Sequence, residues 1–222
     1  MNVLVIDVGG SHVKCLLSGE AEPRVFDSGP DMTPQDMVDG VTKATTGWSW
    51  DAVSIGYPGP VRDNKPIGEP HNLAKGWVGF DFEAAFGAPV RMINDAAMQA
   101  LGSYRGGRML FLGLGTGLGS AMILDHVIQP LELAHMPYRK GRTFEQWVGE
   151  EAMDRLGKRK WRKVVAEVVE TLRGALLPDY VVLGGGNARK LSELPPDTVA
   201  GENANAFRGG FLLWGAGPAG PG

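Results

Sequence analysis

The sequence is poor in cysteine, in long apolar runs and in excess charge of either sign. Its one cysteine, Cys15, excludes an intrachain disulfide and a zinc site built from several cysteines, and it fits a reducing compartment, so we expect a cytoplasmic protein. No run approaches the roughly 20 apolar residues that a membrane-spanning helix needs. The opening MNVLVIDVGG has no basic segment before a long apolar one, so we expect no signal peptide.

The charge balance argues against two classes of partner. The formal net charge is −3, so no global positive field favours nucleic acid or an acidic membrane surface. The 222 residues, 43% of them hydrophobic, are enough for one large or two small domains with buried cores. We therefore expect a folded protein that binds small molecules and neither nucleic acid nor a membrane.

Short apolar runs alternate with periodic segments along the chain, which predicts an α/β fold. Strands are expected at residues 2–7, 12–17, 52–56, 90–93, 109–112, 120–124 and 180–183. Helices are expected at residues 34–45, 96–104, 144–156, 161–176 and 204–214, with another after residue 186. Thr33 and Pro34 have the residue types of a helix cap and a first helical residue.

One pattern of strand, glycine-rich turn and strand occurs twice in the chain. It reads VLVIDVGGSHVKCLL near the start and MLFLGLGTGLGSAMIL at mid-chain. Hairpins argue against a purely parallel sheet, so we expect mixed sheets in two related lobes with a cleft between them. The lobes are predicted at residues 1–106 and 107–222, with the break near Gly106 and Gly107, and the last helix can pack back on the first lobe.

The second glycine loop, GLGTGLG at residues 113–119, matches neither of two common nucleotide fingerprints. A dinucleotide fingerprint needs G-x-G-x-x-G before a helix, but Leu118 stands at its third glycine position and a strand follows. A Walker-type loop needs Gly-Lys-Ser/Thr, which does not follow. A hairpin turn that exposes backbone N–H groups, together with the hydroxyl of Thr116, can still hold a phosphate. A plain glycine-rich turn is the alternative.

The first glycine loop brings an acid, a hydroxyl and a cation close together in sequence. Asp7 precedes the glycines, and Ser11 and Lys14 follow them. A carboxylate suits Mg²⁺, while backbone N–H groups, Ser and Lys suit phosphate oxygens. An ordinary hairpin turn is the alternative, but two such loops in one chain favour a phosphate-binding role.

Two further patterns each allow a structural and a functional interpretation. Asn94 or Asp95 can cap a helix, or Asp95 can act as a general base toward a hydroxyl that attacks a phosphoryl group. The cations KRKWRK at residues 158–163 can be a solvated helix face or a contact for a polyanion.

A Glu-x-x-His pattern joins Glu132 to His135, and Glu145 follows it. Such a pair can bind a metal, but the sequence shows no companion set of ligands. Hydrogen bonds to a sugar are a second interpretation, and an ordinary core or surface histidine is a third.

Six motifs, taken in chain order, resemble the ROK family of sugar kinases, whose fold is the two-lobed actin/hexokinase-like (ribonuclease H-like) α/β fold. They are DVGGSHVK at 7–14, GYPGPV at 56–61, NL at 72–73 with Trp77, NDA at 94–96, GLGTGLG at 113–119 and VVLGGG at 181–186. The resemblance covers nearly the whole chain. The compact, zinc-free members with a Phe-Glu-x-Trp segment, here FEQW at 144–147, look most similar, and these are the polyphosphate glucokinases.

The resemblance implies phosphoryl transfer to the 6-hydroxyl of glucose with Asp95 as the general base. The sugar contacts that it implies are Asn72, Asn94, Glu132, His135 and Glu145. The phosphate or nucleotide contacts that it implies are Asp7, Gly9, Gly10, Ser11, Lys14, Gly115, Thr116, Gly117, Gly184, Gly185 and Gly186. It further implies Mg²⁺ near Asp7, ATP or polyphosphate as the donor, and a homodimer. Another hexose (an N-acetylhexosamine, mannose or fructose) and a non-catalytic sugar-binding regulator are the alternatives.

Several positions depart from the family pattern. Many members bind zinc through a His and a cysteine cluster, but no cysteine follows Cys15, so we expect no zinc site. Ala134 replaces the usual Gly before the His, and His12 stands where a small residue is usual. The chain is short even for a polyphosphate glucokinase, which leaves the donor site and the oligomer interface open. The first expected strand starts at residue 2, so we expect none of the N-terminal helix-turn-helix of the family's repressors.

Overall fold

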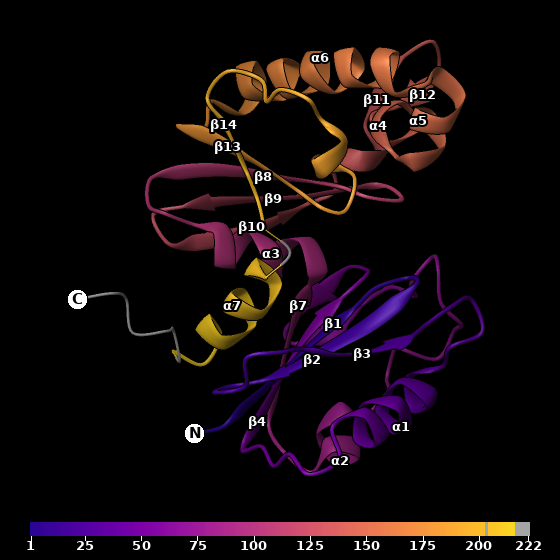
Figure 1. Cartoon of the computed structure of the whole chain (residues 1–222), viewed down its shortest axis with the longest axis vertical. Coiled ribbons are helices and arrows are strands. Elements are labelled where there is room, and N and C mark those ends of the chain that lie inside the picture. Colours follow the sequence, from indigo (N-terminus) through magenta and orange to yellow (C-terminus); the bar gives the residue numbers. More distant parts are fainter. Residues whose placement is uncertain (203, 216–222) are drawn as a thin grey trace. The chain divides into compact units, whose positions relative to one another are not determined.

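The computed structural model describes residues 1–202 and 204–215, which form two compact units (Figure 1). Unit 1 consists of Met1–Met98 together with the chain from Ala206, and unit 2 consists of Gln99–Asn205. The division falls inside helix α3 (Asp95–Ser103), ahead of the glycine pair at which the sequence predicts it. Residues 203 and 216–222 of the predicted second lobe lie outside the described residues.

Unit 1 is built on a mixed five-stranded sheet with the strand order β3-β2-β1-β4-β7. Its strands are β1 (Val3–Val8), β2 (His12–Leu17), β3 (Arg24–Asp27), β4 (Ala52–Tyr57) and β7 (Val90–Asn94). The first three form an antiparallel meander, and β4 pairs in parallel with both β1 and β7. Asp7 stands opposite Gly56, and Gly56 stands opposite Ile93, so the three parallel strands end at one edge of the sheet.

Unit 2 repeats this strand order as β10-β9-β8-β13-β14. Its strands are β8 (Arg108–Leu114), β9 (Leu118–Leu124), β10 (Val127–Leu131), β13 (Tyr180–Gly184) and β14 (Thr198–Ala200). Again three antiparallel strands are followed by two parallel ones. The two glycine-turn hairpins expected from the repeated pattern are confirmed, whereas β3, β10 and β14 lack a strong sequence signal. Each edge strand in this group is partly exposed, and its residues do not form an uninterrupted apolar run.

The first two helices of unit 1 begin where side chains can satisfy their first N–H groups. In α1 (Pro34–Ala44) Thr33 accepts a hydrogen bond from the Asp36 N–H, and Asp36 accepts one from the Thr33 N–H, which confirms the predicted cap. Asp81 caps the short α2 (Phe82–Phe86). The remaining elements of the unit are the small hairpin of β5 (Val61–Arg62) and β6 (Lys65–Pro66), and α7 (Asn205–Leu212), which begins at the last residue of unit 2.

Unit 2 contains the long α6 (Lys158–Leu176), preceded by α4 (Glu145–Val148) and α5 (Glu150–Leu156), which are grouped near its N-terminal end in Figure 1. The prediction of one helix over residues 144–156 is wrong, because Gly149 takes an extended conformation with ψ 175° between α4 and α5. A Cβ at Gly149 would lie only 2.6 Å from the carbonyl oxygen of Thr116. The close approach of the glycine loop therefore explains this break.

The prediction of a helix after residue 186 is also wrong. The chain makes a single 3₁₀ turn, η2 (Ala188–Lys190), before it crosses to β14. The backbone N–H of Asn187 bonds to the carbonyl of Leu114 at 2.9 Å, and its side chain bonds to the carbonyl of Gly115 at 2.9 Å. These bonds hold the segment against β8.

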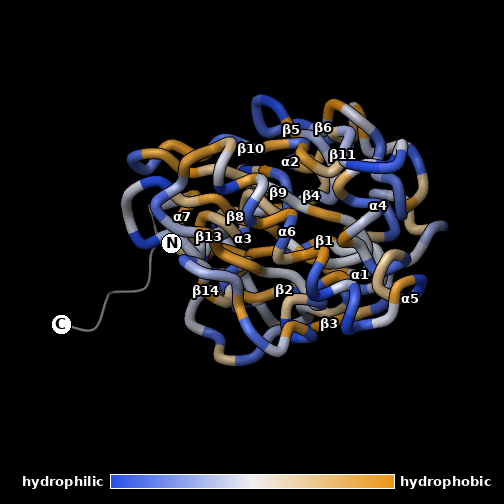
Figure 2. The backbone as a smooth tube through the Cα atoms, turned by 90° about the horizontal axis from the view of Figure 1, so that it is seen from above, coloured by the Kyte–Doolittle hydropathy of each residue, from blue (hydrophilic) through white to orange (hydrophobic). Residues whose placement is uncertain are grey.

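Hydrophobic residues concentrate in the strands of both sheets, and hydrophilic residues dominate many of the connecting loops (Figure 2). The cores contain the residues that the apolar runs select, such as Leu4 and Ile6 in unit 1 and Leu110 and Leu112 in unit 2. Trp161 is fully buried and donates from Nε1 to the carbonyl of Val148 at 2.8 Å, which fixes α6 against α4. Within the described ranges, no helix has the length and apolar character to cross a membrane.

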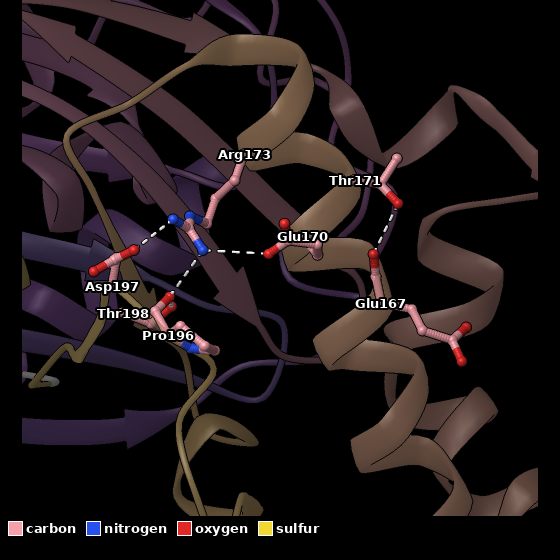
Figure 3. Close-up of polar contacts among 7 residues, drawn as sticks. All are labelled: Glu167, Glu170, Thr171, Arg173, Pro196, Asp197 and Thr198. Carbon is pink, nitrogen blue, oxygen red and sulfur yellow. Dashed lines mark hydrogen bonds and ion pairs between the residues drawn. The ribbon is translucent and has the colours of Figure 1, made fainter.

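The C-terminal end of α6 is bonded to the segment that leads into β14 (Figure 3). Arg173 donates to Asp197 at 2.6 Å, to the carbonyl of Pro196 at 3.2 Å and to Glu170 at 3.2 Å. Asp197 has a positive φ of 52°, a conformation that costs energy for a residue with a side chain. The arginine thus anchors a strained turn at the start of an edge strand.

Candidate functional site

The edge where the parallel strands of unit 1 end carries Asp7 and the first glycine loop. Lys14 is the register partner of Asp7 on β2, and its Nζ lies 3.9 Å from Asp7 Oδ2. Burial raises the pKa of Asp7, and the Lys14 charge lowers it by less. The strand pairing therefore places a carboxylate and a cation side by side on the two strands that this loop joins.

The first glycine loop is held in a tight conformation by neighbouring backbone. The Gly9 N–H donates to the carbonyl of His12 at 3.0 Å, and a Cβ at Gly9 would lie 2.9 Å from the same oxygen. Ser28, which follows β3, donates from Oγ to the Gly9 carbonyl at 2.6 Å and from its N–H to the Ser11 carbonyl at 2.9 Å. Ser28 could not be predicted from the sequence, because nothing local distinguishes it from an ordinary loop serine.

Asn72 lies directly against this loop. A Cβ at Gly10 would lie 3.0 Å from Asn72 Cβ, so Gly10 allows the exposed asparagine segment to approach closely. The structure therefore brings a predicted sugar contact and a predicted phosphate contact together within unit 1.

Glu69 organises the segment that carries Asn72, and its role could not be predicted from the sequence either. Its carboxylate accepts hydrogen bonds from the N–H groups of Gly76 at 3.1 Å, Trp77 at 3.0 Å and Val78 at 3.4 Å. Partial burial acts to raise the pKa of Glu69, but these donors, together with the charge of Lys75, outweigh it and lower the pKa. The segment from residue 69 to residue 78 is therefore closed into a loop by one carboxylate.

Asn94 and Asp95 stand where β7 ends and α3 begins. Asn94 Oδ1 accepts from the Ala97 N–H at 3.1 Å, which makes Asn94 the helix cap, and its Nδ2 donates to the Gly59 carbonyl at 3.2 Å. The half-buried Asp95 is the first residue of the helix, and its Oδ1 accepts from the Ala96 N–H at 2.8 Å. Because Ile93 stands opposite Gly56 and Gly56 opposite Asp7, Asp95 lies at the same edge of the sheet as Asp7.

The second glycine loop, in unit 2, is closed by its own backbone and held by two glutamates. The Gly115 N–H donates to the Gly117 carbonyl at 3.1 Å, around Thr116. The Glu150 N–H, at the start of α5, donates to the carbonyls of Gly115 and Thr116, both at 3.1 Å. Glu145 Oε2 accepts from the Leu118 N–H at 3.3 Å and occupies the space that a side chain at Gly117 would need.

The glycines at the end of β13 contact β8 where the second glycine loop begins. Gly184 stands opposite Gly113, and Gly185, with φ +81°, packs against the Leu114 carbonyl, where a Cβ would not fit. The buried Asn187 is bonded to both Leu114 and Gly115. Asn187 joins the two glycine segments, and no motif in the sequence marks it.

Glu132 and His135 lie at the end of β10 and on the 3₁₀ turn η1 (Leu133–His135). Glu132 Oε2 and His135 Nε2 are 4.0 Å apart, and both side chains are exposed. Ser120 anchors the turn: its Oγ donates to the Leu131 carbonyl at 2.8 Å and accepts from the Leu133 N–H at 3.2 Å. In the part of the chain that the structure describes, no group of three or more His, Cys, Asp or Glu side chains is placed to hold a metal.

Two units with one repeated strand order, each with a glycine loop in its leading hairpin, define a protein of the actin/hexokinase-like fold that sugar kinases share. The model of the ROK family matches residues 3–130, and the chain belongs to the ROK family. A curated relative is the polyphosphate glucokinase of Mycobacterium tuberculosis, which is 27% identical over 213 residues, with 86% of this chain and 80% of the relative covered.

Solved structures show the same fold over almost the whole chain. The inorganic polyphosphate/ATP-glucomannokinase from Arthrobacter sp. strain KM has a TM-score of 0.82 and 22% identity, with 96% of this chain and 97% of that chain covered. A ROK family glucokinase from Streptomyces griseus, in complex with glucose and AMPPNP, has a TM-score of 0.73 and 17% identity, with 96% and 99% covered. The predicted fold class and the resemblance are therefore confirmed.

Proposed function

We propose that this protein is a sugar kinase that transfers a phosphoryl group from polyphosphate or ATP to the 6-hydroxyl of glucose. The observation that carries the proposal is the common sheet edge of unit 1. There the register brings the end of β7, and with it Asp95, to the edge that carries Asp7 and its glycine loop, and Asn72 packs on Gly10. A base, a phosphate loop and a sugar-binding amide are the groups that phosphoryl transfer to a sugar needs. The names of the relatives support this donor and this sugar.

Asp95 is the proposed general base. Its carboxylate accepts the proton of the sugar hydroxyl as that oxygen bonds to the terminal phosphorus. The bond from phosphorus to its bridging oxygen breaks, and the negative charge leaves on ADP or on the shortened polyphosphate. Asn94 takes over the capping of α3, so Asp95 does not have to serve as the helix cap.

The glycine loops are the proposed phosphate contacts. Backbone N–H groups of Gly9, Gly10 and Ser11, with Lys14, would bind phosphate in unit 1. In unit 2 the phosphate contacts would be Gly115, Thr116, Gly117, Gly184, Gly185 and Gly186. The hydrogen bonds from Ser28, Glu150 and Asn187 keep both loops in shape before a ligand arrives.

Asp7 is the residue that would hold Mg²⁺. Proteins bind Mg²⁺ through one or two carboxylates and complete its shell with water and substrate phosphates. The single carboxylate of Asp7 beside a glycine loop fits that arrangement, and the described residues offer no cage of several carboxylates. Bound there with the donor, the ion would neutralise phosphate charge, while Lys14 offsets the charge of the carboxylate.

The proposed sugar contacts fall into two groups. Asn72 and Asn94 belong to unit 1, and Glu132, His135 and Glu145 belong to unit 2. Asn94 and Glu145 already bond to the protein, but amide and carboxylate oxygens have further acceptor capacity for sugar hydroxyls.

A donor-by-sugar activity matrix tests the proposed function. Purified protein is assayed with ATP, tripolyphosphate and long-chain polyphosphate against glucose, mannose, fructose and N-acetylhexosamines, and the sugar 6-phosphate is measured. We expect the highest kcat/KM with glucose. A higher kcat/KM with another hexose would make that hexose the substrate instead of glucose. Sugar binding without phosphoryl transfer from any of the donors would show a non-catalytic regulator.

A further inference from the structure

Unit 2 carries seven cations on two neighbouring elements. They are Lys158, Arg159, Lys160, Arg162 and Lys163 at the start of α6, and Arg189 and Lys190 on η2. Among the described residues, no ion pair forms at Lys158, Arg159, Lys160, Lys163 or Arg189, and these five are exposed. A cluster of exposed cations without anionic partners attracts polyanions.

The cations are physically connected to the second glycine loop. Arg162 donates from Nε to the Lys190 carbonyl at 2.7 Å, which joins α6 to η2. Lys190 Nζ lies 4.0 Å from Glu150 Oε1, and the Glu150 backbone is bonded to the loop at Gly115 and Thr116. A path of direct contacts therefore runs from the glycine loop to the start of α6.

Helical geometry separates the α6 cations into two groups. Side chains four residues apart share a face, so Lys158 lies on the same flank as Arg162, the residue that bonds to η2. Arg159 and Lys163 form the next row, toward solvent. Lys160 lies on the opposite flank of the helix. The buried face between these flanks consists of Trp161, Val164, Val165, Val168, Val169 and Leu172.

We propose that six of these cations bind the distal part of a polyphosphate chain whose terminal phosphates occupy the second glycine loop. The six, which we call the basic surface, are Lys158, Arg159, Arg162, Lys163, Arg189 and Lys190. This inference rests on the proposed function, and it adds a second contact region for one class of donor. A long donor would touch both the loop and the basic surface, whereas ATP or tripolyphosphate would touch the loop alone.

The chemistry of the surface favours a bare phosphate chain over other polyanions. The one aromatic residue of the run, Trp161, is fully buried, so no platform is available for stacking nucleic acid bases. The run also has no exposed large apolar residue to anchor a membrane. The neighbouring α5 carries Glu150, Glu151 and Asp154. Glu151 lies 3.6 Å from Arg155, which is outside the basic surface, whereas Glu150 lies near Lys190 and lowers the net positive charge of the basic surface by one.

The test compares two triple variants with the same change of charge. The first, K158Q/R159Q/K163Q, removes three cations of the basic surface that do not take part in the contacts between α6, η2 and the second glycine loop. The matched control, K43Q/R62Q/K140Q, removes exposed cations elsewhere. Binding of fluorescently labelled long-chain polyphosphate is followed by anisotropy over a range of salt, independently of turnover, and kcat/KM is measured with long-chain polyphosphate, tripolyphosphate and ATP.

We expect the first variant to bind long polyphosphate at least ~10-fold more weakly than the wild type, with a shallower salt dependence, because fewer cations are released on binding. Its kcat/KM should fall for the long chain and stay within about twofold for the short donors, while the control and Lys160→Gln stay near wild type. Equal polyphosphate affinity of the two triple variants would overturn the inference. If the wild type bound heparin or single-stranded DNA as tightly as it binds long-chain polyphosphate, the assignment to polyphosphate would be overturned.

The outcomes also separate this inference from the proposed function. Polyphosphate binding that depends on the basic surface, without phosphoryl transfer to any sugar, would support the basic surface and contradict the sugar kinase. Sugar phosphorylation by ATP without polyphosphate binding would support the sugar kinase and contradict the role of the basic surface.

Discussion

Two adjacent residues share the work at the start of α3. Asn94 satisfies the helix N–H group of Ala97, and Asp95 stands one position later as the proposed base. Replacement of Asp95 by asparagine keeps the shape of the side chain and leaves the cap in place. The two roles can therefore be separated by mutation.

For Asp95→Asn we expect kcat to fall about 10²- to 10⁴-fold, the range for loss of a general base. The Kd for glucose, measured by calorimetry, should change little. The exposed Asp31→Asn serves as the charge-matched control. A kcat near that of the wild type would rule out Asp95 as the base.

Glu69 links pH to the stability of the Asn72 segment. Its pKa is lowered in the folded protein, so its contribution to stability is present above the unfolded value, about 4.3, and is lost as the pH falls through the folded value. We expect Glu69→Gln to lower the urea midpoint at pH 7, and the gap to wild type to narrow as the pH falls below about 4.3. The control Glu22→Gln, at an exposed position, should have the same urea midpoint as the wild type at each pH.

A gap that stays constant down to pH 3 would contradict this role of Glu69. The same variant should raise the KM for glucose more than it lowers kcat, because the segment that it loosens carries Asn72 and not the base. Glu69→Asp, which keeps the charge, should restore part of the KM.

At the scale of elements, the Arg173 contacts join α6 to the start of β14. Replacement of Arg173 by methionine should lower the free energy of unfolding by about 1–2 kcal/mol, because three bonds are lost at a partly exposed site. Glu170→Gln breaks only the pair within the helix and should cost less than about 0.5 kcal/mol. Urea unfolding measures both, and equal losses would show that the bonds to the β14 segment contribute nothing.

The sequence predicts the strands and helices better than it predicts the long-range contacts that interrupt or shorten them. The boundaries of β2 match the prediction, because Gly9 and Gly10 precede that strand and Ser18 and Gly19 follow it. The break at Gly149 and the single 3₁₀ turn after Gly186 were not predicted. Both depend on contacts with residues 114–116, far away in the chain, and a local pattern contains no information about them.

At the scale of the whole molecule, turnover with either donor should depend on Mg²⁺. If Mg²⁺ is held between Asp7 and the donor phosphates, its removal should abolish turnover with ATP and with polyphosphate alike. Sugar binding should persist in EDTA, and added Mg²⁺ should restore the rate. Turnover in EDTA at more than about a tenth of the normal rate would contradict a required ion.

The candidate site could be predicted in part for the same reason as the fold. Its motifs are short, local and repeated in family order, so Asp7, Asn94 and the glycine loops were visible in the sequence. Glu69, Ser28 and Asn187 were not, because each bonds to backbone seven or more residues away in the sequence. They are ordinary polar residues until the chain is folded.

Glu145 has a consequence for how the two substrates affect each other's binding to unit 2. One carboxylate fills the space that a side chain at Gly117 would need, accepts a hydrogen bond from the Leu118 N–H beside the second glycine loop, and is a proposed sugar contact. A sugar that orients Glu145 would therefore also settle the loop for a phosphate, and a phosphate in the loop would prepare Glu145 for a sugar. Linkage requires that each ligand then change the affinity of the other by the same factor, so this carboxylate would make the two substrates bind synergistically.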